Sequence, residues 1–208
     1  MAFLNDCCIF DEVTEELHGQ LTGFVCEQEP LIEKFFRDEC VMHDGQLLSR
    51  TYCFHKDSKG ADDAVKKEAV AGFCVSCSNV ATKLIPKATR NKINRKIPYE
   101  KQRDHYPAVM IGQLCVFDGF ADTHCGDELM RAVKFWSCDL ARQIGARYLI
   151  VDAVNKPKVL EYYKRNGFLF VFPDVELECQ YMNLSVGEEP RTRFMLFDLM
   201  PVFRELDS

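Results

Sequence analysis

Apolar runs of strand length alternate with helical patterns along this chain. Hydrophobic residues at helical spacing predict a helix over residues 28–39, with its apolar positions at Leu31, Ile32, Phe35 and Phe36. Two further runs predict strands, LLSRTYCF from Leu47 and AVAGFCVS from Ala69. The charged segment between them, KDSKGADDAVKK, predicts a hairpin with a long tip.

The middle of the chain carries the clearest strand and helix. Residues 108–117 are nearly all apolar, which predicts a central strand covered on both faces, and Gly112 inside it predicts a bulge or the close approach of another backbone. After a short polar loop, apolar residues recur at intervals of three and four and predict a helix that ends near Gly145. They are Leu129, Val133, Trp136, Leu140 and Ile144.

A short strand over residues 148–154 and a second helix follow. Asn155 is the expected helix cap, Pro157 lies in the first turn and Gly167 ends the helix. The run RTRFMLFDL from Arg191 predicts a final strand after a polar loop at 187–190. No repeat or linker divides the chain, so we predict one α/β domain over residues 1–208, a mixed sheet with helices on both faces.

Composition agrees with a folded protein and narrows its surroundings. The chain has 208 residues, 47% hydrophobic and 28% charged, enough to bury about 70% of its unfolded surface in one core. The N-terminus does not resemble a signal peptide, and no stretch approaches the roughly 20 apolar residues of a membrane span. We therefore expect a cytoplasmic protein with no membrane partner.

The eleven cysteines do not predict a disulfide framework, because their number is odd and most lie in apolar runs, where they behave as small buried hydrophobes. Two sets of residues contain metal-ligand types. Cys74 and Cys77 form a Cys-x-x-Cys inside a predicted strand, without a second such pair. The other set lacks helical register and consists of Cys40, His43, Cys53 and His55. We expect no metal.

Charge is uneven along the chain. The net charge of −6 argues against a nucleic-acid surface over the whole molecule. One basic arm, from Lys83 to Arg103, is the exception, and it is either a solvated connector or a segment that meets phosphates. Between its ends lie Lys87, Arg90, Lys92, Arg95, Lys96 and Lys101, opposed only by Glu100.

The polar loop before the long helix is a candidate anion site. The amides and dipole at a helix start favour a pyrophosphate, and Gly126 would let the backbone approach it closely. Thr123 could cap the helix or bind the ligand. The alternative is an ordinary capped connector. The loop residues in question are Asp122, Thr123, His124, Cys125 and Gly126.

Tyr163 is the candidate acid. It lies on a helical stripe with Val159, Tyr162 and Asn166, so a core tyrosine is the alternative. A phenol with a pKa of about 10 can donate a proton to a departing thiolate whose thiol has a pKa near 8.5 if the site lowers the phenol's pKa or traps the thiolate by a hydrogen bond. The order of elements thus suggests transfer from an acyl thioester to an amine, although no carboxylate stands out as a base.

These residues resemble a known family. The strand PAVMIGQLCV, the loop ADTHCG and the Tyr-x-x-x-Gly-Phe end made by Tyr163, Gly167 and Phe168 are similar to the GNAT superfamily of acetyl-CoA-dependent N-acetyltransferases. The segment HGQLTGFVCEQEPLIEKFF resembles its toxin-type subgroup. The resemblance implies a GNAT-like fold, acetyl-CoA as acyl donor and Tyr163 as general acid. Its cofactor residues would be Leu114, Cys115, Val116, Ala121, Asp122, Thr123, His124, Cys125, Gly126, Asp127 and Asn155.

The loop departs from the family's Arg/Gln-x-x-Gly-x-Gly/Ala pattern. Ala121 replaces the first residue, His124 the first glycine, and Gln113 a common arginine, so only Gly126 remains. Backbone amides could still bind phosphate. The loop after His55, the basic arm and residues 173–190 are longer than in compact toxins, which weakens the case for a toxin role.

The resemblance leaves two functions open. One is an enzyme that acetylates a primary amine by direct attack, the acceptor being an aminoacyl-tRNA, a small amine, an antibiotic or a protein N-terminus. The altered loop suggests the other, a non-catalytic acyl-CoA-binding sensor or interaction module. A homodimer and an antitoxin partner are both compatible with the sequence.

Overall fold

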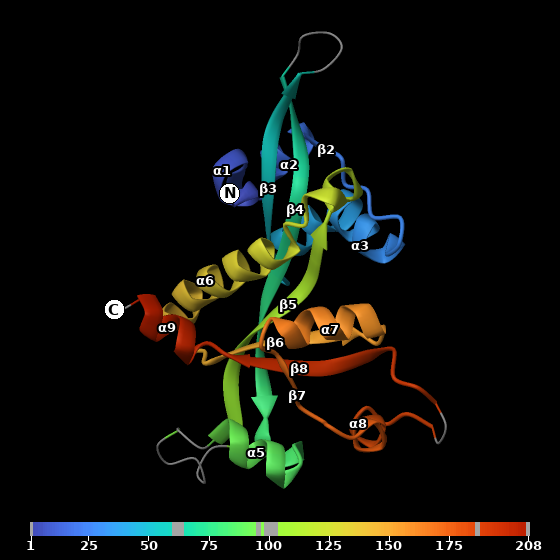
Figure 1. The fold of residues 1–208 in the computed structure, drawn as a ribbon, viewed down its shortest axis with the longest axis vertical. Helices are drawn as coiled ribbons and strands as arrows, with labels where there is room; N and C mark the ends of the chain where they lie inside the picture. The colour runs from blue at the N-terminus through green and yellow to red at the C-terminus, as the bar shows by residue number, and fades with distance from the viewer. Residues whose placement is uncertain (1, 60–64, 95–96, 98–103, 186–187, 207–208) are drawn as a thin grey trace. The chain divides into compact units, whose positions relative to one another are not determined.

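The computed structural model describes residues 2–59, 65–94, 97, 104–185 and 188–206. Their strands form an eight-stranded sheet in the order β1-β3-β4-β5-β6-β8-β7, with β2 parallel to β4 (Figure 1). The predicted α/β class with a mixed sheet is confirmed. The contacts of the chain define two compact units, Met1–Ser76 with Ile111–Val133 and Cys77–Met110 with Lys134–Ser208. The prediction of a single domain over residues 1–208 stays a prediction.

The first unit is built on a long hairpin. Its strands are β3 (Arg50–Lys59) and the first part of β4 (Val65–Ala81), antiparallel, with β1 (Ile9–Glu12) on the other edge of β3. The predicted hairpin is confirmed, but both strands run into the segment expected to be its tip, of which residues 60–64 lie outside the described residues. Opposite charges face each other there: Lys56 pairs with Glu68, and Asp57 with Lys67.

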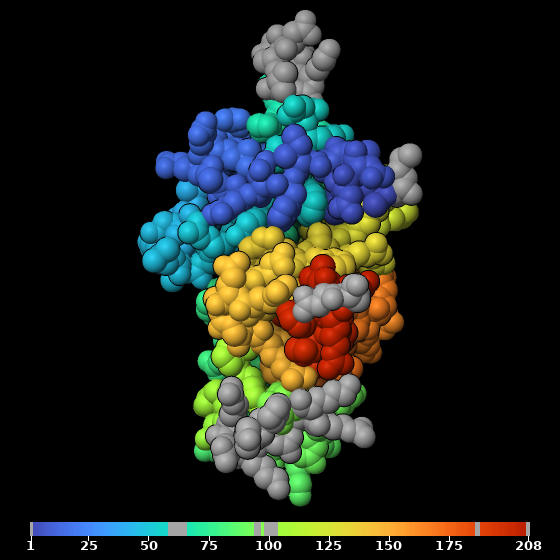
Figure 2. All heavy atoms as spheres, turned by 90° about the vertical axis from the view of Figure 1, so that its left-hand side faces the viewer, coloured from blue at the N-terminus to red at the C-terminus, as the bar shows by residue number. Residues whose placement is uncertain are grey.

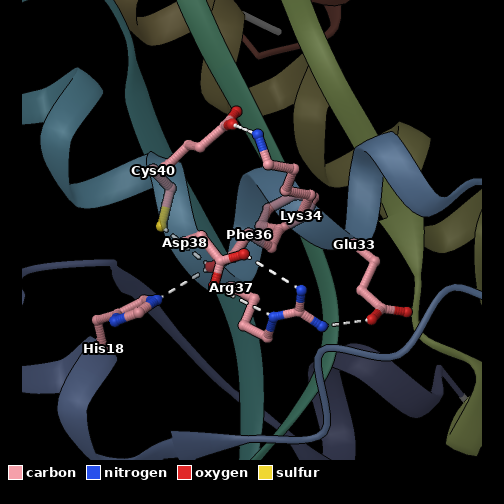
Figure 3. Close-up of polar contacts among 8 residues, drawn as sticks. His18, Glu33, Lys34, Phe36, Arg37, Asp38 and Cys40 are labelled. Atoms are coloured by element: carbon pink, nitrogen blue, oxygen red, sulfur yellow. Dashed lines mark hydrogen bonds and ion pairs between the residues drawn. The ribbon is translucent and has the colours of Figure 1, made fainter.

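Short elements surround this hairpin. They are α1 (Phe3–Cys7), α2 (Glu15–Gln20), β2 (Leu21–Thr22), α3 (Pro30–Lys34), the π-helix η1 (Phe35–Glu39) and α4 (Cys40–Gly45). The helix predicted over 28–39 is confirmed from Pro30 to Glu39 by α3 and η1, and α4 continues it to Gly45. In the π turn the Cys40 amide bonds to the Phe35 carbonyl. The Phe36 carbonyl instead accepts from His18 Nε2 at 3.0 Å and Cys40 Sγ at 3.2 Å (Figure 3).

The core of the first unit is aromatic and rich in thiols. The rings of Phe24 and Phe36 each meet Phe117 edge to face, with centroids 5.4 and 5.3 Å apart. The expectation that most cysteines are buried is confirmed, and all eleven are free thiols. Five lie in this core, namely Cys26, Cys40, Cys53, Cys74 and Cys115.

Strand β5 (His105–Val116) lies where the central strand was predicted, but it is not covered on both faces. Gly112 is exposed, and Gln113, Leu114 and Val116 are half-buried, so the strand is not sealed on both faces. A close approach at Gly112 is confirmed in a different form. A Cβ there would lie 2.8 Å from Cys74 Sγ, so a side chain approaches and not another backbone.

The second unit is centred on two antiparallel strands, β6 (Tyr148–Val154) and β8 (Thr192–Asp198), with β7 (Leu169–Phe170) on the far edge of β8. Both long strands confirm the sequence prediction. The helical elements of this unit are η2 (Thr82–Leu84), α5 (Lys87–Asn94), α7 (Pro157–Arg165), α8 (Val175–Tyr181) and α9 (Met200–Leu206). The helix α5 forms part of the basic arm, whose residues 95–96 and 98–103 lie outside the described residues.

Helix α6 (Gly126–Ile144) has the predicted length, and Gly145 ends it at a φ of +72°. Its predicted apolar stripe is confirmed at Leu129 and Val133, which are buried, but Trp136 and Leu140 are only half-buried and Ile144 is exposed. Helix α9 lies beside the second half of α6 (Figure 2). Arg142 lies over the ring of Phe203, and the two helices line a cavity of about 360 Å³. The buried positions are Leu129, Met130, Val133, Ser137, Cys138 and Ala141.

Candidate active site

The loop predicted to hold a pyrophosphate is a short helix followed by a turn. After β5 comes the 3-10 helix η4 (Asp118–Thr123), then His124 in the left-handed region, then α6 from Gly126. That Thr123 caps α6 stays a prediction. Its hydroxyl donates to the Phe120 carbonyl at 2.6 Å, and the Cys125 carbonyl accepts the first helical bond, from Leu129. A ligand bond to Thr123 stays a prediction.

His124, which stands where the family pattern has a glycine, takes a backbone conformation that favours glycine. Its φ is +54° and its ψ is +25°, a left-handed conformation that glycine adopts freely. A side chain in that conformation costs about 1–2 kcal/mol, less for histidine and asparagine than for branched residues. His124 therefore differs from the family pattern in its side chain, and its backbone makes a turn that glycine can also make.

The loop is acidic, which opposes a pyrophosphate. It contains four carboxylates, those of Asp118, Asp122, Asp127 and Glu128. Two of them are bonded to backbone: Asp118 accepts from the Glu27 amide at 2.8 Å, and Glu128 accepts from the amides of Phe3 and Leu4 at 3.0 and 2.8 Å. Phosphate binding here would depend on main-chain amides, because these side chains repel an anion.

Asn155 follows β6 but does not cap α7. The cap residue is Lys156, without a side-chain bond, while Pro157 occupies the first turn as predicted. The Asn155 side chain donates from Nδ2 to the Pro190 carbonyl at 2.9 Å, and its backbone amide donates to Arg191 at 2.9 Å. The side chain therefore holds the segment that leads into β8. Its contact with a cofactor stays a prediction.

The Tyr-x-x-x-Gly-Phe pattern at the end of α7 is a Schellman motif. The Phe168 amide bonds to the Tyr163 carbonyl at 3.0 Å, and the Gly167 amide bonds to the Lys164 carbonyl at 2.8 Å. Gly167 takes a φ of +82°, as the motif requires. The rings of Tyr163 and Phe168 meet edge to face with centroids 5.2 Å apart, the hydrophobic contact that accompanies the motif. The motif thus fixes the backbone and ring of Tyr163.

Tyr163 is almost completely enclosed, with 6% of its surface exposed. Its ring lies between Tyr162, with centroids 5.4 Å apart, and Phe168. Burial raises the pKa of the Tyr163 phenol well above its ordinary value of 10.0. Of the two routes considered from the sequence, a lowered phenol pKa is therefore wrong. A neutral phenol that donates a hydrogen bond to a thiolate stays compatible with the structure.

Sequence reasoning missed a carboxylate with a perturbed pKa. Partial desolvation, and then the charge of Glu178, raise the pKa of Asp152 in β6, although the residue is exposed. Glu178 itself is fully buried and accepts from Arg193 Nε at 2.5 Å and from the Phe194 amide at 2.5 Å. The signal was present in the sequence, because Asp152 is the one charged residue in the apolar run YLIVDAV.

The predicted residues fall into the two units. The strand residues Leu114, Cys115 and Val116 and the loop from Ala121 to Asp127 belong to the first, and Asn155 and Tyr163 to the second.

Over the residues that the structure describes, no three His, Cys, Asp or Glu side chains are grouped to hold a metal ion. No helix among them is both long and apolar enough to cross a membrane.

No protein-family model and no curated protein matches the chain. Solved structures do match it. A tyrosine-to-phenylalanine mutant of KacT is 18% identical, with a TM-score of 0.67, over 96% of this chain and 99% of that chain. AtaT complexed with acetyl-methionyl-tRNAfMet is 17% identical, with a TM-score of 0.66, over 96% and 99%. The chain shares the fold of KacT and AtaT. The predicted GNAT-like fold is thereby confirmed.

A third match is AtaTR bound with AcCoA, 18% identical, with a TM-score of 0.65, over 97% of this chain and 99% of that chain. The likeness covers nearly the full length of the chain. At this identity it establishes the fold, and the activity has to be argued from the residues.

Proposed function

We propose that the chain is an acetyl-CoA-dependent N-acetyltransferase that transfers an acetyl group to a primary amine by direct attack. The observation that carries the proposal is Tyr163, enclosed in the second unit and fixed by a Schellman motif, in a chain that shares its fold with AtaT. AtaT has been solved with acetyl-CoA, and mutants of both AtaT and KacT replace a tyrosine by phenylalanine.

The cofactor would be held mainly by backbone. Main-chain groups of Leu114, Cys115 and Val116 would bind its extended arm, and amides from Ala121 to Asp127 would bind its pyrophosphate, with Asn155 beside the thioester end. Support comes from the half-buried end of β5 and from the glycine-like turn at His124. Because the loop side chains are acidic, we expect modest affinity that falls as salt screens the dipole of the helix start.

Each group in the proposed reaction has a defined task. The neutral amine attacks the thioester carbonyl carbon, a tetrahedral intermediate forms, and the carbon–sulfur bond breaks as the thiolate leaves. The Tyr163 hydroxyl donates a hydrogen bond to that thiolate, which then takes its proton from solvent. The amine loses a proton, and Asp152, whose pKa is raised, is the carboxylate assigned to accept it.

Phenylalanine at position 163 tests the proposal. Tyr163→Phe keeps the ring packing and removes the donor, so kcat should fall by about 100-fold or more while the KM for acetyl-CoA changes little. Tyr162→Phe is the matched control, because its ring adjoins Tyr163 on the same helix and it should keep full activity. Equal turnover of the wild type and Tyr163→Phe would overturn the assignment of the acid.

The amine of an aminoacyl-tRNA is the first acceptor to test. AtaT has been solved with acetyl-methionyl-tRNAfMet, and helix α5 of this chain has three cations and no carboxylate, with Lys87 and Lys92 exposed. Lys87→Glu with Lys92→Glu should weaken tRNA binding and flatten its salt dependence by about one to two phosphate contacts. Unchanged binding would exclude α5 from the RNA surface. Small amines, antibiotics and protein N-termini remain the other acceptors.

A non-catalytic acyl-CoA-binding module is the second candidate function, and it is motivated by the departure of the loop ADTHCG from the family pattern. It would bind acetyl-CoA without releasing free CoA over a broad panel of amines.

AtaT has also been solved with the C-terminus of an antitoxin. An antitoxin partner, a homodimer and a cytoplasmic location stay predictions for this chain, and gel filtration of the purified protein tests the homodimer.

A further inference from the structure

Two buried thiols of the first unit face each other across a gap of 3.2 Å. Cys115 Sγ donates to Cys26 Sγ, although the two residues are 89 positions apart. Cys115 lies near the end of β5, and Cys26 lies in the segment between β2 and α3. A disulfide has an S–S length of about 2.05 Å, so the sulfurs need to approach by only about 1.2 Å to bond.

Hydrogen bonds on both sides of Cys26 hold the two thiols in this arrangement. The Asp118 amide donates to the Val25 carbonyl at 2.9 Å, and the Asp118 carboxylate accepts from the Glu27 amide at 2.8 Å. The Cys26 amide itself donates to Glu33 Oε2 at 3.1 Å. Because Asp118 follows Cys115 by three residues, these bonds clamp the Cys26 segment to the end of β5.

The two thiols also differ in acidity, as a reactive pair requires. The hydrogen bond from Cys115 lowers the pKa of Cys26, and the Glu29 amide adds to that effect against burial and the charge of Asp118. The same hydrogen bond, with burial, raises the pKa of Cys115. Cys26 is therefore the more acidic thiol of the pair.

The other thiols of this core lack these features. Burial raises the pKa of Cys40 and of Cys74 to about 11, and raises that of Cys53 as well. The sulfurs of Cys40 and Cys53 donate to backbone carbonyls at 3.2 and 3.3 Å and have no second sulfur as a hydrogen-bond partner among the residues that the structure describes, whereas Cys115 Sγ has both the Val116 carbonyl and Cys26 Sγ at 3.2 Å. Cys26 and Cys115 each keep some solvent contact, 7% and 8% of their surface, which a small oxidant can use.

We propose that Cys26 and Cys115 form a reversible disulfide when the protein meets a hydroperoxide. The Cys26 thiolate attacks the outer peroxide oxygen, the O–O bond breaks, and an alkoxide or hydroxide leaves with a proton from solvent. The resulting sulfenic acid is attacked by the Cys115 sulfur, which expels water and forms the S–S bond. Two electrons pass from the two thiols to the peroxide.

The disulfide also affects the proposed cofactor site, a consequence that rests on the proposed function. Cys115 stands between Leu114 and Val116, on the strand expected to bind the acyl-CoA arm. Drawing its sulfur toward Cys26 in a packed core shifts the main chain of that strand. Oxidation should therefore raise the Kd for acetyl-CoA several-fold, and dithiothreitol should restore it.

Peptide mapping tests the bond itself. The full-length protein is treated with hydrogen peroxide, free thiols are blocked with N-ethylmaleimide, and the protein is cleaved at Lys, Arg, Asp and Glu without reduction. Cleavage at acidic residues separates Cys26 from Cys7 and Cys8, and Cys115 from Cys125. A dominant Cys26–Cys115 peptide, lost in Cys26→Ala and in Cys115→Ala and retained in Cys77→Ala, is the expected result.

The opposite outcomes are distinct. If peroxide oxidises the exposed Cys7 and Cys77 while Cys26 and Cys115 still react with N-ethylmaleimide after unfolding, the proposed disulfide is wrong. If the disulfide forms and the Kd of oxidised wild type equals that of peroxide-treated Cys26→Ala, control over the cofactor is wrong. If the fully reduced protein does not bind acetyl-CoA at all, the proposed function fails and the disulfide stands on the mapping alone.

Discussion

Gly167→Ala should destabilise the protein by about 1–2 kcal/mol, because an alanine side chain is strained at positive φ. The φ of Gly167 is +82°, and a Cβ there would lie 3.2 Å from Cε2 of Phe197, closer than an ordinary contact. The substitution also strains the two Schellman bonds that close α7 behind Tyr163. For a chain of this size each kcal/mol lowers Tm by about 2–4 °C.

Gly19→Ala provides the matched control. Gly19 lies in α2, where an added Cβ would meet no neighbouring atom within 4 Å, and it should gain about 0.5–1 kcal/mol from the same chemical change. Urea unfolding followed by circular dichroism measures both variants. Gly167→Ala should also lose turnover, because the motif fixes Tyr163. The reasoning is refuted if Gly167→Ala is as stable as the wild type, or if both variants lose the same amount.

Three further predictions concern titratable groups. Glu178→Gln leaves Arg193 buried without its charge partner and should lower the free energy of unfolding by about 3–5 kcal/mol, with an unchanged urea midpoint as the contrary result. Burial raises the phenol pKa of Tyr148 and Tyr163 in the folded protein, so the unfolded chain releases these protons at a lower pH. Stability should therefore fall above about pH 10, and Tyr163→Phe should lose less stability in that range. The raised pKa of Asp152 makes stability fall as pH rises from about 4. Asp152→Asn should flatten this dependence of stability on pH and should also lower kcat. The same dependence in the variant and the wild type would contradict the prediction.

Local patterns were sufficient for the elements that depend on near neighbours. The length of α6, the bounds of β6 and the Gly167 stop of α7 all followed from spacing and from glycine and proline chemistry. Tyr163 could be singled out for the same reason, because the motif that fixes it spans only six residues. The short helices α1, α2, α8 and α9 were not predicted, since each is five to seven residues long and carries little periodicity.

Contacts between distant segments decided the rest. Which face of α6 is buried, how far β3 and β4 extend, and where the Asn155 side chain points depend on partners that the sequence does not identify. The raised pKa of Asp152 depends on Glu178, which comes from another element.

The sequence by itself determined the class of fold and the order of its main elements. It also singled out Tyr163 as the candidate acid and the loop ADTHCG as the candidate anion site. Only the tertiary structure decided that Tyr163 is enclosed and neutral, that the loop keeps a glycine-like turn at His124, and that Cys26 faces Cys115. The physical reason is range: dihedral preferences and helix-end bonds act over a few residues, whereas burial and electrostatic shifts arise from groups brought together across the whole chain.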